Sequence, residues 1–182
     1  MSGPPQTLDF SHVGVYVYDL ETMHEFYVRV LGFKVTDKGI ARGRPIVFLS
    51  RNPDEHHQIV LAEGRTGERS DRVVNQISLR AGGLQDLRDL KETLEAEPNV
   101  SDIDPICHGN AWSVYFRDPE GNRIEVFVDS PWYCDQPMIE PLDLSMSDEE
   151  IAQATRDAIK DRPGFQPLES WKAEFADKLN AS

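Results

Sequence analysis

A carboxylate and a phenol share one face of a predicted β-hairpin in the second half of the chain. Residues 112–116 and 123–128 are rich in β-branched and aromatic side chains. The Asp-Pro-Glu-Gly sequence between them is typical of a tight turn, because Pro presets φ and Gly accepts a positive φ. Since side chains alternate between the faces of a strand, Tyr115 and Glu125 lie away from the aliphatic residues, opposite each other if the turn is a short bulged one. Two interpretations of Glu125 stay open, a solvent-facing glutamate and a functional acid.

A histidine occupies the corresponding kind of position near the start of the chain. Residues 8–18 alternate strictly, which predicts a strand with Val13, Val15 and Val17 on one face and His12 on the other. One interpretation of His12 is a histidine whose ring is satisfied by the backbone. Its non-aliphatic face, together with Glu125, favours the other interpretation, a metal ligand.

The elements that must position these side chains recur in the same order. Residues 8–63 and 72–130 each predict strand, helix and three further strands. Asp19 or Thr22 is expected to cap the first helix, which Gly32 ends, and a leucine stripe closed by Pro98 marks the second. The sequence therefore predicts an α+β fold in which tandem βαβββ modules form a curved mixed sheet, a cup, with helices outside.

Residues 131–182 predict a tether and a helical C-terminal extension. Residues 131–133 and 137–141 are interpreted as tether rather than strand, and a capping box of Ser147 and Glu150 starts a helix that runs to about residue 161. A second helix is predicted over residues 168–179. The aromatic anchors expected in this extension are Trp132, Trp171 and Phe175. It is expected to pack on the core or on a partner subunit, which favours a homo-oligomer; a partly ordered extension is the alternative.

Composition excludes several classes of partner. The formal net charge is −13 and no basic stripe is present, which argues against nucleic acid and anionic membranes. The first residues lack the basic and apolar regions of a signal peptide, and no run is long enough to span a membrane, so a cytoplasmic protein is predicted. Cys107 and Cys134 lack metal-type spacing and are predicted to be free thiols.

The tandem order, with His12 on the first strand and Glu125 within Asp-Pro-Glu-Gly-Asn-Arg-Ile-Glu-Val-Phe, resembles the vicinal oxygen chelate superfamily. That group includes glyoxalase I, methylmalonyl-CoA epimerase, fosfomycin and bleomycin resistance proteins, and type I extradiol dioxygenases. The resemblance covers about residues 8–130. Glu-His-His-Gln-Ile-Val-Leu at 55–61, and His-Gly-Asn at 108–110 upstream of Tyr115, are similar to the extradiol branch, closest to a single-domain extradiol dioxygenase.

The resemblance implies a ring-cleaving dioxygenase of aromatic catabolism that acts on a catechol-like diol with O2 at non-haem Fe(II), with Mn, Ni, Co or Zn as alternative metals. His57 would be the acid–base residue, and His108 and Tyr115 would hold the substrate oxygen. The implied metal ligands are His12, Gln76 and Glu125, the implied substrate-binding residues are Asn110 and Trp112, and the aromatic lining is Tyr16, Trp112 and Phe127.

One position departs from the dioxygenase pattern. Gln76 stands where those enzymes carry a metal-binding histidine, and an amide oxygen is a weaker donor than imidazole for a late first-row ion. His57 is an alternative third ligand, and its neighbour His56 is interpreted as a surface residue. Two other function classes stay open: a divalent-metal isomerase, epimerase or lyase of the glyoxalase type, and a metal-free small-molecule binding protein on the same scaffold.

Overall fold

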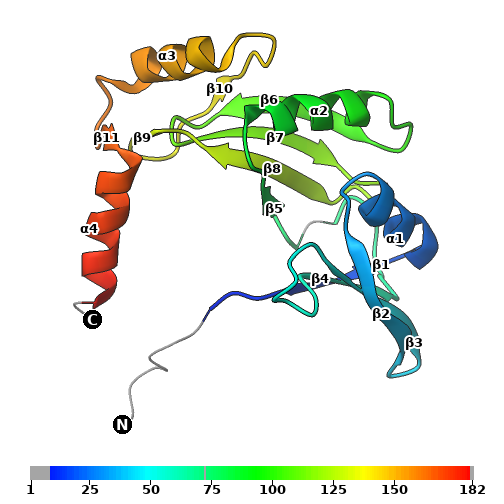
Figure 1. Ribbon diagram of the computed structural model, residues 1–182. Helices are drawn as coiled ribbons and strands as arrows, with labels where there is room; N and C mark the ends of the chain where they lie inside the picture. Colours follow the sequence, from blue (N-terminus) through cyan, green and yellow to red (C-terminus); the bar gives the residue numbers. More distant parts are fainter. Residues whose placement is uncertain (1–8, 72, 181–182) are drawn as a thin grey trace. The chain divides into compact units, whose positions relative to one another are not determined.

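The computed structural model describes residues 9–71 and 73–180, and the chain divides into two compact units, residues 1–71 and 72–182. Figure 1 labels the helices and strands of both units. Residues 8 and 72, where the two modules are predicted to begin, lie outside the described residues.

The first unit is a four-stranded sheet with one helix on it. Its elements are β1 (Val13–Val17), α1 (Leu20–Arg29), β2 (Lys34–Ala41), β3 (Arg44–Ser50) and β4 (Ile59–Glu63). The strand order is β1-β4-β3-β2, with β1 parallel to β4 and the other pairs antiparallel. Asp19 is the N-cap of α1 and accepts a hydrogen bond from the Thr22 amide at 3.1 Å. The helix ends at Arg29, and Gly32 follows with φ +70°.

The second unit repeats this topology. Its first elements are β5 (Ile77–Arg80), α2 (Leu84–Glu95), β6 (Ser101–Cys107), β7 (Ala111–Arg117) and β8 (Arg123–Asp129). The order β6-β7-β8-β5, with β5 parallel to β8, matches β2-β3-β4-β1 of the first unit. The predicted repeat and the α+β class are therefore confirmed. The first strand of this unit is shorter than predicted, because residues before Ile77 do not pair with β8.

Register gives each residue of one unit a counterpart in the other. Val13 pairs with Ile59 in the first unit, and Ile77 pairs with Ile124 in the second. His12 and Gln76, each one residue earlier, therefore hold equivalent positions. By the same count the counterpart of Glu125 in the first unit is Val60, so only the second unit places a carboxylate at this point of its last strand.

The two faces of the second sheet differ in polarity. Val114, Phe116 and Ile124 are fully buried on the face against which α2 packs with its leucine stripe. Tyr115 and Glu125 are directly paired across β7 and β8 and lie on the other face, as the period of two predicts. A polar cluster therefore occupies the sheet face that α2 leaves uncovered.

The C-terminal segment belongs to the second unit and contains the elements α3 (Asp148–Ile159), α4 (Leu168–Asn180), β9 (Trp132–Tyr133), β10 (Glu140–Pro141) and β11 (Gln166–Pro167). Its predicted helices and the Ser147–Glu150 capping box are confirmed. The interpretation of its first part as a tether without strands was wrong. β10 pairs with β6 at the open edge of the sheet, where backbone groups need partners, and β9 pairs with β11 in a separate two-stranded sheet.

Aromatic side chains hold α4 at its first turns. The Trp171 ring stacks between Tyr133 and Phe175, with ring centroids 4.9 and 5.3 Å away. Trp132 contacts Phe165 at 6.0 Å. Among the described residues, no helix has the length and apolar composition needed to cross a bilayer.

Candidate functional site

Glu125, on β8, is the centre of a hydrogen-bonded cluster in the second unit. Its Oε1 accepts from the Ser113 hydroxyl at 2.8 Å and from the Tyr115 hydroxyl at 2.6 Å. Its Oε2 accepts from the Gln76 amide nitrogen at 2.7 Å and from the Ser78 hydroxyl at 2.6 Å. A carboxylate that is only 7% exposed and accepts four side-chain hydrogen bonds is a fixed acceptor, not a solvated surface charge.

His108 extends this cluster by one more residue. Its Nε2 lies 3.0 Å from the Tyr115 hydroxyl, and its Nδ1 lies 2.7 Å from the carbonyl oxygen of Met138, which can only accept a hydrogen bond. The array runs from the Met138 carbonyl through His108 and Tyr115 to Glu125 and brings His108 Nε2 to 4.0 Å from Glu125 Oε1.

The C-terminal segment fixes the position of His108. The Gln136 side-chain amide donates to the His108 carbonyl at 2.8 Å and accepts from the Met138 backbone amide at 3.0 Å. Gly109, next to His108, has φ +76°, and a Cβ there would lie 2.8 Å from the Cys134 sulfur. The loop is thus closely packed against residues 134–138.

The environment of Tyr115 favours its neutral form. Burial raises the pKa of the Tyr115 phenol well above its usual range, and the hydrogen bond and negative charge of Glu125 act in the same direction. The Arg123 guanidinium, 4.1 Å from the ring centroid, opposes this shift. Tyr115 is therefore a hydroxyl donor at neutral pH.

We expect the raised pKa of Tyr115 to make the free energy of unfolding fall more steeply with pH in the alkaline range. In the unfolded chain the Tyr115 phenol loses its proton at about pH 10, whereas in the folded chain it does so only at higher pH. The contribution of this group to the free energy of unfolding is therefore complete below pH 10 and falls above pH 10 by up to ~1.4 kcal/mol per pH unit. Tyr115→Phe should flatten this dependence. Urea unfolding of the chelator-treated protein between about pH 9 and pH 11 measures it. Ser113→Ala removes another donor to Glu125 but no phenol, so it should change the free energy of unfolding by the same amount at each pH and leave its slope against pH unchanged. Parallel curves for wild type and Tyr115→Phe would contradict the expectation.

The first unit places His12 beside His57. Their ring centroids are 4.2 Å apart, and Phe48 packs on His57 at 5.2 Å. Burial lowers the pKa of His57, the neighbouring His12 and His56 lower it further, and Glu55 opposes them. A neutral imidazole in contact with another imidazole is suited to accept a proton.

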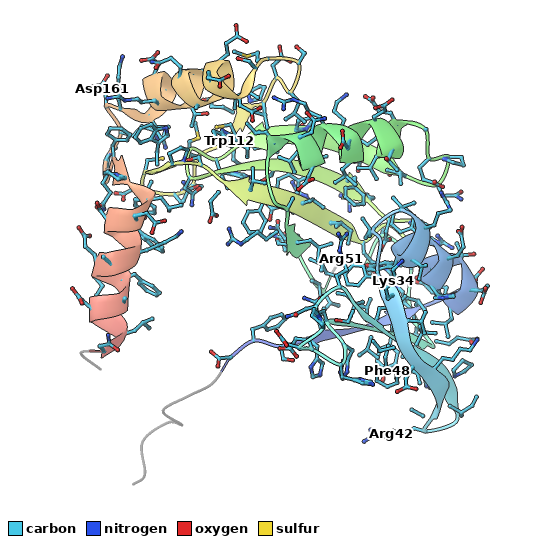
Figure 2. All side chains as sticks on the ribbon, viewed as in Figure 1. Lys34, Arg42, Phe48, Arg51, Trp112 and Asp161 are labelled. Atoms are coloured by element: carbon cyan, nitrogen blue, oxygen red, sulfur yellow. The ribbon has the colours of Figure 1, made fainter. Side chains whose placement is uncertain are left out.

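The other predicted site residues do not all lie on the sheet face that carries Glu125. Trp112 does not share the face of Glu125: it points to the opposite side of β7, where its Nε1 donates to Thr155 of α3 at 2.8 Å (Figure 2). The period of two separates it from Tyr115, so its predicted roles in substrate binding and site lining are not supported. Phe127 shares the face of Glu125, and Tyr16 is exposed on β1. Asn110 lies in the β6–β7 loop.

The residues predicted as metal ligands are His12 in the first unit and Gln76 and Glu125 in the second, and their imidazole, amide and carboxylate groups are donor types that divalent first-row metals accept. Within the described ranges 9–71 and 73–180, no three His, Cys, Asp or Glu side chains group as a metal site. Gln76 turns its amide nitrogen, not its oxygen, to Glu125. Ligation of a metal through the Gln76 side-chain oxygen would therefore require the amide group to rotate so that its oxygen and nitrogen exchange places.

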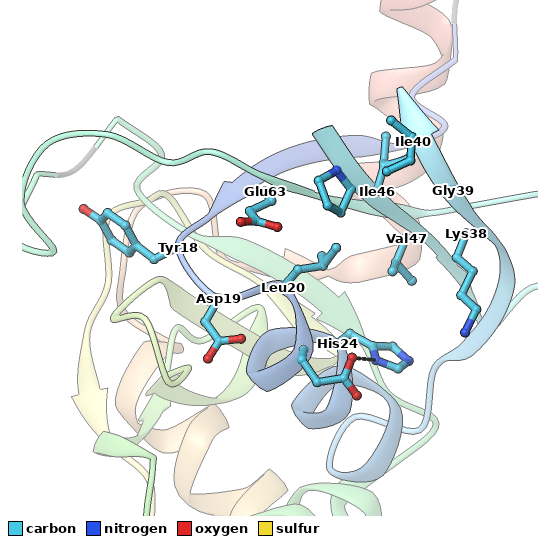
Figure 3. Close-up of a pocket in the computed structure, with 12 residues that line it drawn as sticks. Tyr18, Asp19, Leu20, His24, Lys38, Gly39, Ile40, Ile46, Val47 and Glu63 are labelled. Carbon is cyan, nitrogen blue, oxygen red and sulfur yellow. Dashed lines mark ion pairs between the residues drawn. The ribbon is translucent and has the colours of Figure 1, made fainter. Parts of the chain in front are cut away.

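A cavity of about 810 Å³ lies elsewhere in the first unit, between α1 and the β2–β3 hairpin (Figure 3). Val47 and Lys38 line it from the sheet, and His24, in an ion pair of 3.8 Å with Glu21, lines it from the helix. Val47 faces α1, whereas its neighbour Phe48 faces His57. The cavity therefore lies on the face of the sheet opposite to His57 and contains none of the predicted site residues.

Several polar partners were not predicted as site residues. Ser78 and Ser113 share the strand parity of Glu125, which is a signal that the sequence contains. His56 is exposed, in agreement with its interpretation as a surface residue, and its Nδ1 also lies 2.9 Å from His57 Nδ1. Gln136 and Met138 approach His108 only through the path of the C-terminal segment, for which no local pattern exists.

The paired βαβββ units, one of which carries a buried glutamate on its last strand, define a glyoxalase-type protein. Residues 9–126 match the family described as Glyoxalase/Bleomycin resistance protein/Dioxygenase superfamily, and the chain belongs to that superfamily.

Named relatives include two biphenyl-2,3-diol 1,2-dioxygenases and a metapyrocatechase. The chain is 29% identical over 131 residues to biphenyl-2,3-diol 1,2-dioxygenase 2 of Rhodococcus globerulus, covering 68% of this chain and 64% of that one. It is 30% identical over 128 residues to biphenyl-2,3-diol 1,2-dioxygenase 3 of the same organism, covering 66% and 63%. Metapyrocatechase of Geobacillus stearothermophilus is 24% identical over 147 residues, covering 80% and 44%. The chain thus spans less than two thirds of the length of these relatives.

Solved structures support the fold. A glyoxylase/bleomycin resistance protein/dioxygenase domain from Frankia sp. EAN1pec has a TM-score of 0.58 at 22% identity, covering 68% of this chain and 98% of that one. The fosfomycin resistance protein FosX of Listeria monocytogenes, complexed with Mn(II) and sulfate, has a TM-score of 0.52 at 17% identity, covering 66% and 91%. At these identities the likeness concerns the fold alone.

Proposed function

We propose that the protein is an extradiol-type dioxygenase that cleaves the ring of a catechol-like diol with O2. The observation that carries the proposal is the hydrogen-bonded array His108–Tyr115–Glu125 in the second unit. It puts a phenol hydroxyl and an imidazole beside a buried carboxylate, a set that can orient a diol oxygen and exchange a proton with it. The named relatives, two biphenyl-diol dioxygenases and a metapyrocatechase, support the same activity.

The proposed metal ligands are His12, Gln76 and Glu125, and Fe(II) is the proposed ion. When bound, Fe(II) supplies the Lewis acidity that favours ionised diol oxygens and the redox chemistry that O2 requires. In this proposal His57 takes a proton from the substrate hydroxyl and later returns it. Its contact with His12, at 4.2 Å between ring centroids, supports a place for it next to a metal ligand. Tyr115 and His108 orient the second substrate oxygen.

A second candidate is a divalent-metal isomerase or lyase. Gln76 favours it, because an amide binds a late first-row ion more weakly than the imidazole expected of a dioxygenase, and enolate chemistry needs a metal and a base but no redox change. Both candidates need a proton acceptor, and both use His57.

Oxygen uptake separates the two candidates. The chain is purified anaerobically with Fe(II), its metal content is measured, and 2,3-dihydroxybiphenyl or catechol is added in air-saturated buffer. We expect stoichiometric iron, oxygen uptake equal to the diol consumed, and a yellow ring-opened product. A tightly bound metal without oxygen uptake or colour would support the isomerase or lyase, and a chain that binds no divalent metal would overturn both.

A further inference from the structure

His57 is the end of a hydrogen-bonded series that starts at a carboxylate of the same unit. The His56 Nε2 lies 3.0 Å from Asp37 Oδ2, and the His56 Nδ1 lies 2.9 Å from His57 Nδ1. The His56 and His57 rings are nearly perpendicular, with centroids 5.2 Å apart, and Phe48 contacts both. Asp37, His56 and His57 thus form a carboxylate–imidazole–imidazole series.

A β-bulge brings Asp37 into this series. Val35 pairs with Leu49, but the next pair is Asp37 with Phe48, so Thr36 is the extra residue. Regular pairing would place Asp37 opposite Val47, on the face that α1 covers. The bulge turns Asp37 to the face of Phe48 and His57 instead, the kind of re-aiming for which bulges are known next to active sites.

The protons of this series fix the tautomer of His57. An ionised Asp37 can only accept, so His56 carries its proton on Nε2. When the His56 ring is neutral, its Nδ1 is therefore a lone-pair acceptor, and the short Nδ1–Nδ1 contact requires the proton to be on His57 Nδ1. Both contacts are then satisfied with two neutral rings, and the lone pair of His57 is on Nε2.

We propose that Asp37 and His56 are positioning residues that hold His57 in the tautomer with hydrogen on Nδ1, which leaves Nε2 as the proton acceptor. This inference rests on the proposed function insofar as His57 is the acid–base residue. When Nε2 takes the substrate proton, the substrate O–H bond breaks and an N–H bond forms. The Nδ1 proton can then pass to His56 Nδ1, where the positive charge is paired with Asp37. The reverse transfers return the proton.

The exposure of the pair allows a clean test. The side chains of His56 and Asp37 are 56% and 69% exposed, so the contact between them contributes little to folding. We expect Asp37→Ala and His56→Ala to leave the urea unfolding midpoint unchanged. A loss of function in these variants would therefore not be a loss of fold.

Nitrogen NMR reads the tautomer directly. In the ¹⁵N-histidine-labelled, chelator-treated 182-residue chain, with His57 assigned from the spectrum of His57→Gln, we expect His57 to be protonated on Nδ1. Asp37→Ala and His56→Ala should shift His57 towards the Nε2–H tautomer. Asp37→Asn, which keeps an acceptor oxygen, should retain the wild-type signals, as should Asp54→Ala, an exposed carboxylate of the same unit. Nε2–H in the wild type, or no change in Asp37→Ala, would overturn the inference.

Kinetics test the consequence for catalysis. Loss of a partner that orients a histidine costs about 10- to 100-fold, so we expect kcat of Asp37→Ala to fall by that factor while KM stays within about twofold. Asp37→Asn should restore most of kcat. An effect on KM with no fall in kcat would overturn the positioning role. If the wild type cleaves no diol, the proposed function fails, whereas the NMR experiment still decides the tautomer.

Discussion

Replacing Glu125 by alanine should abolish metal binding and ring cleavage and also destabilise the second unit. The substitution deprives Ser113 and Tyr115, which are 0% and 5% exposed, of their shared acceptor. Tyr115 keeps His108 Nε2 as a neighbour at 3.0 Å, so Ser113 is the fully buried donor that loses its partner. A buried donor left without a partner costs about 1–3 kcal/mol, so the free energy of unfolding should fall by about that amount. Gln76 and Ser78 also lose an acceptor but are less buried and can turn to water.

Three measurements on Glu125→Ala separate these effects. Urea unfolding of the metal-free protein reports the hydrogen-bond cluster, metal analysis reports ligation, and oxygen uptake reports turnover. Glu140→Ala, an exposed glutamate on β10 of the same unit, is the matched control and should leave all three unchanged. Full metal occupancy in Glu125→Ala would show that Glu125 is not a ligand. An unchanged unfolding midpoint would show that the cluster does not stabilise the fold.

Replacing His57 by alanine should lower kcat by about 10²- to 10⁴-fold, the usual contribution of a general base. The side chain is half-buried against Phe48 and His12, so stability should change little. Metal content distinguishes the two roles that the sequence leaves open for His57. If His57 is the acid–base residue, His57→Ala should keep its metal. If His57 is the third ligand, His57→Ala should lose its metal.

A second histidine of the same unit provides the control for His57. His24, on α1, lies on the other side of the sheet and pairs with Glu21, so His24→Ala should retain wild-type kcat and metal content. If His57→Ala retained full activity as well, the base would have to be sought elsewhere, and the proposed mechanism would be wrong. If both variants lost activity equally, the loss would point to a general disturbance of the first unit.

Local rules in the sequence determined much of the architecture. Apolar periodicity predicted the strand–helix–strand order of both units, and the period of two placed Tyr115 opposite Glu125. Capping chemistry predicted the starts of α1 and α3 at Asp19 and Ser147. These features depend on neighbours a few residues apart, which is why sequence patterns record them. The metal ligands, the catalytic roles and the homo-oligomer stay predictions.

Only the tertiary structure decided which polar groups meet. The bulge in β2 turns Asp37 towards His56, which the sequence presented as a surface residue, because one unpaired residue reverses the face of those that follow. Trp112 is bound to Thr155, and His108 to the Met138 carbonyl, because α3 and residues 134–138 return to the sheet from far along the chain. Such contacts depend on where distant segments pack, and no local pattern of residues records that.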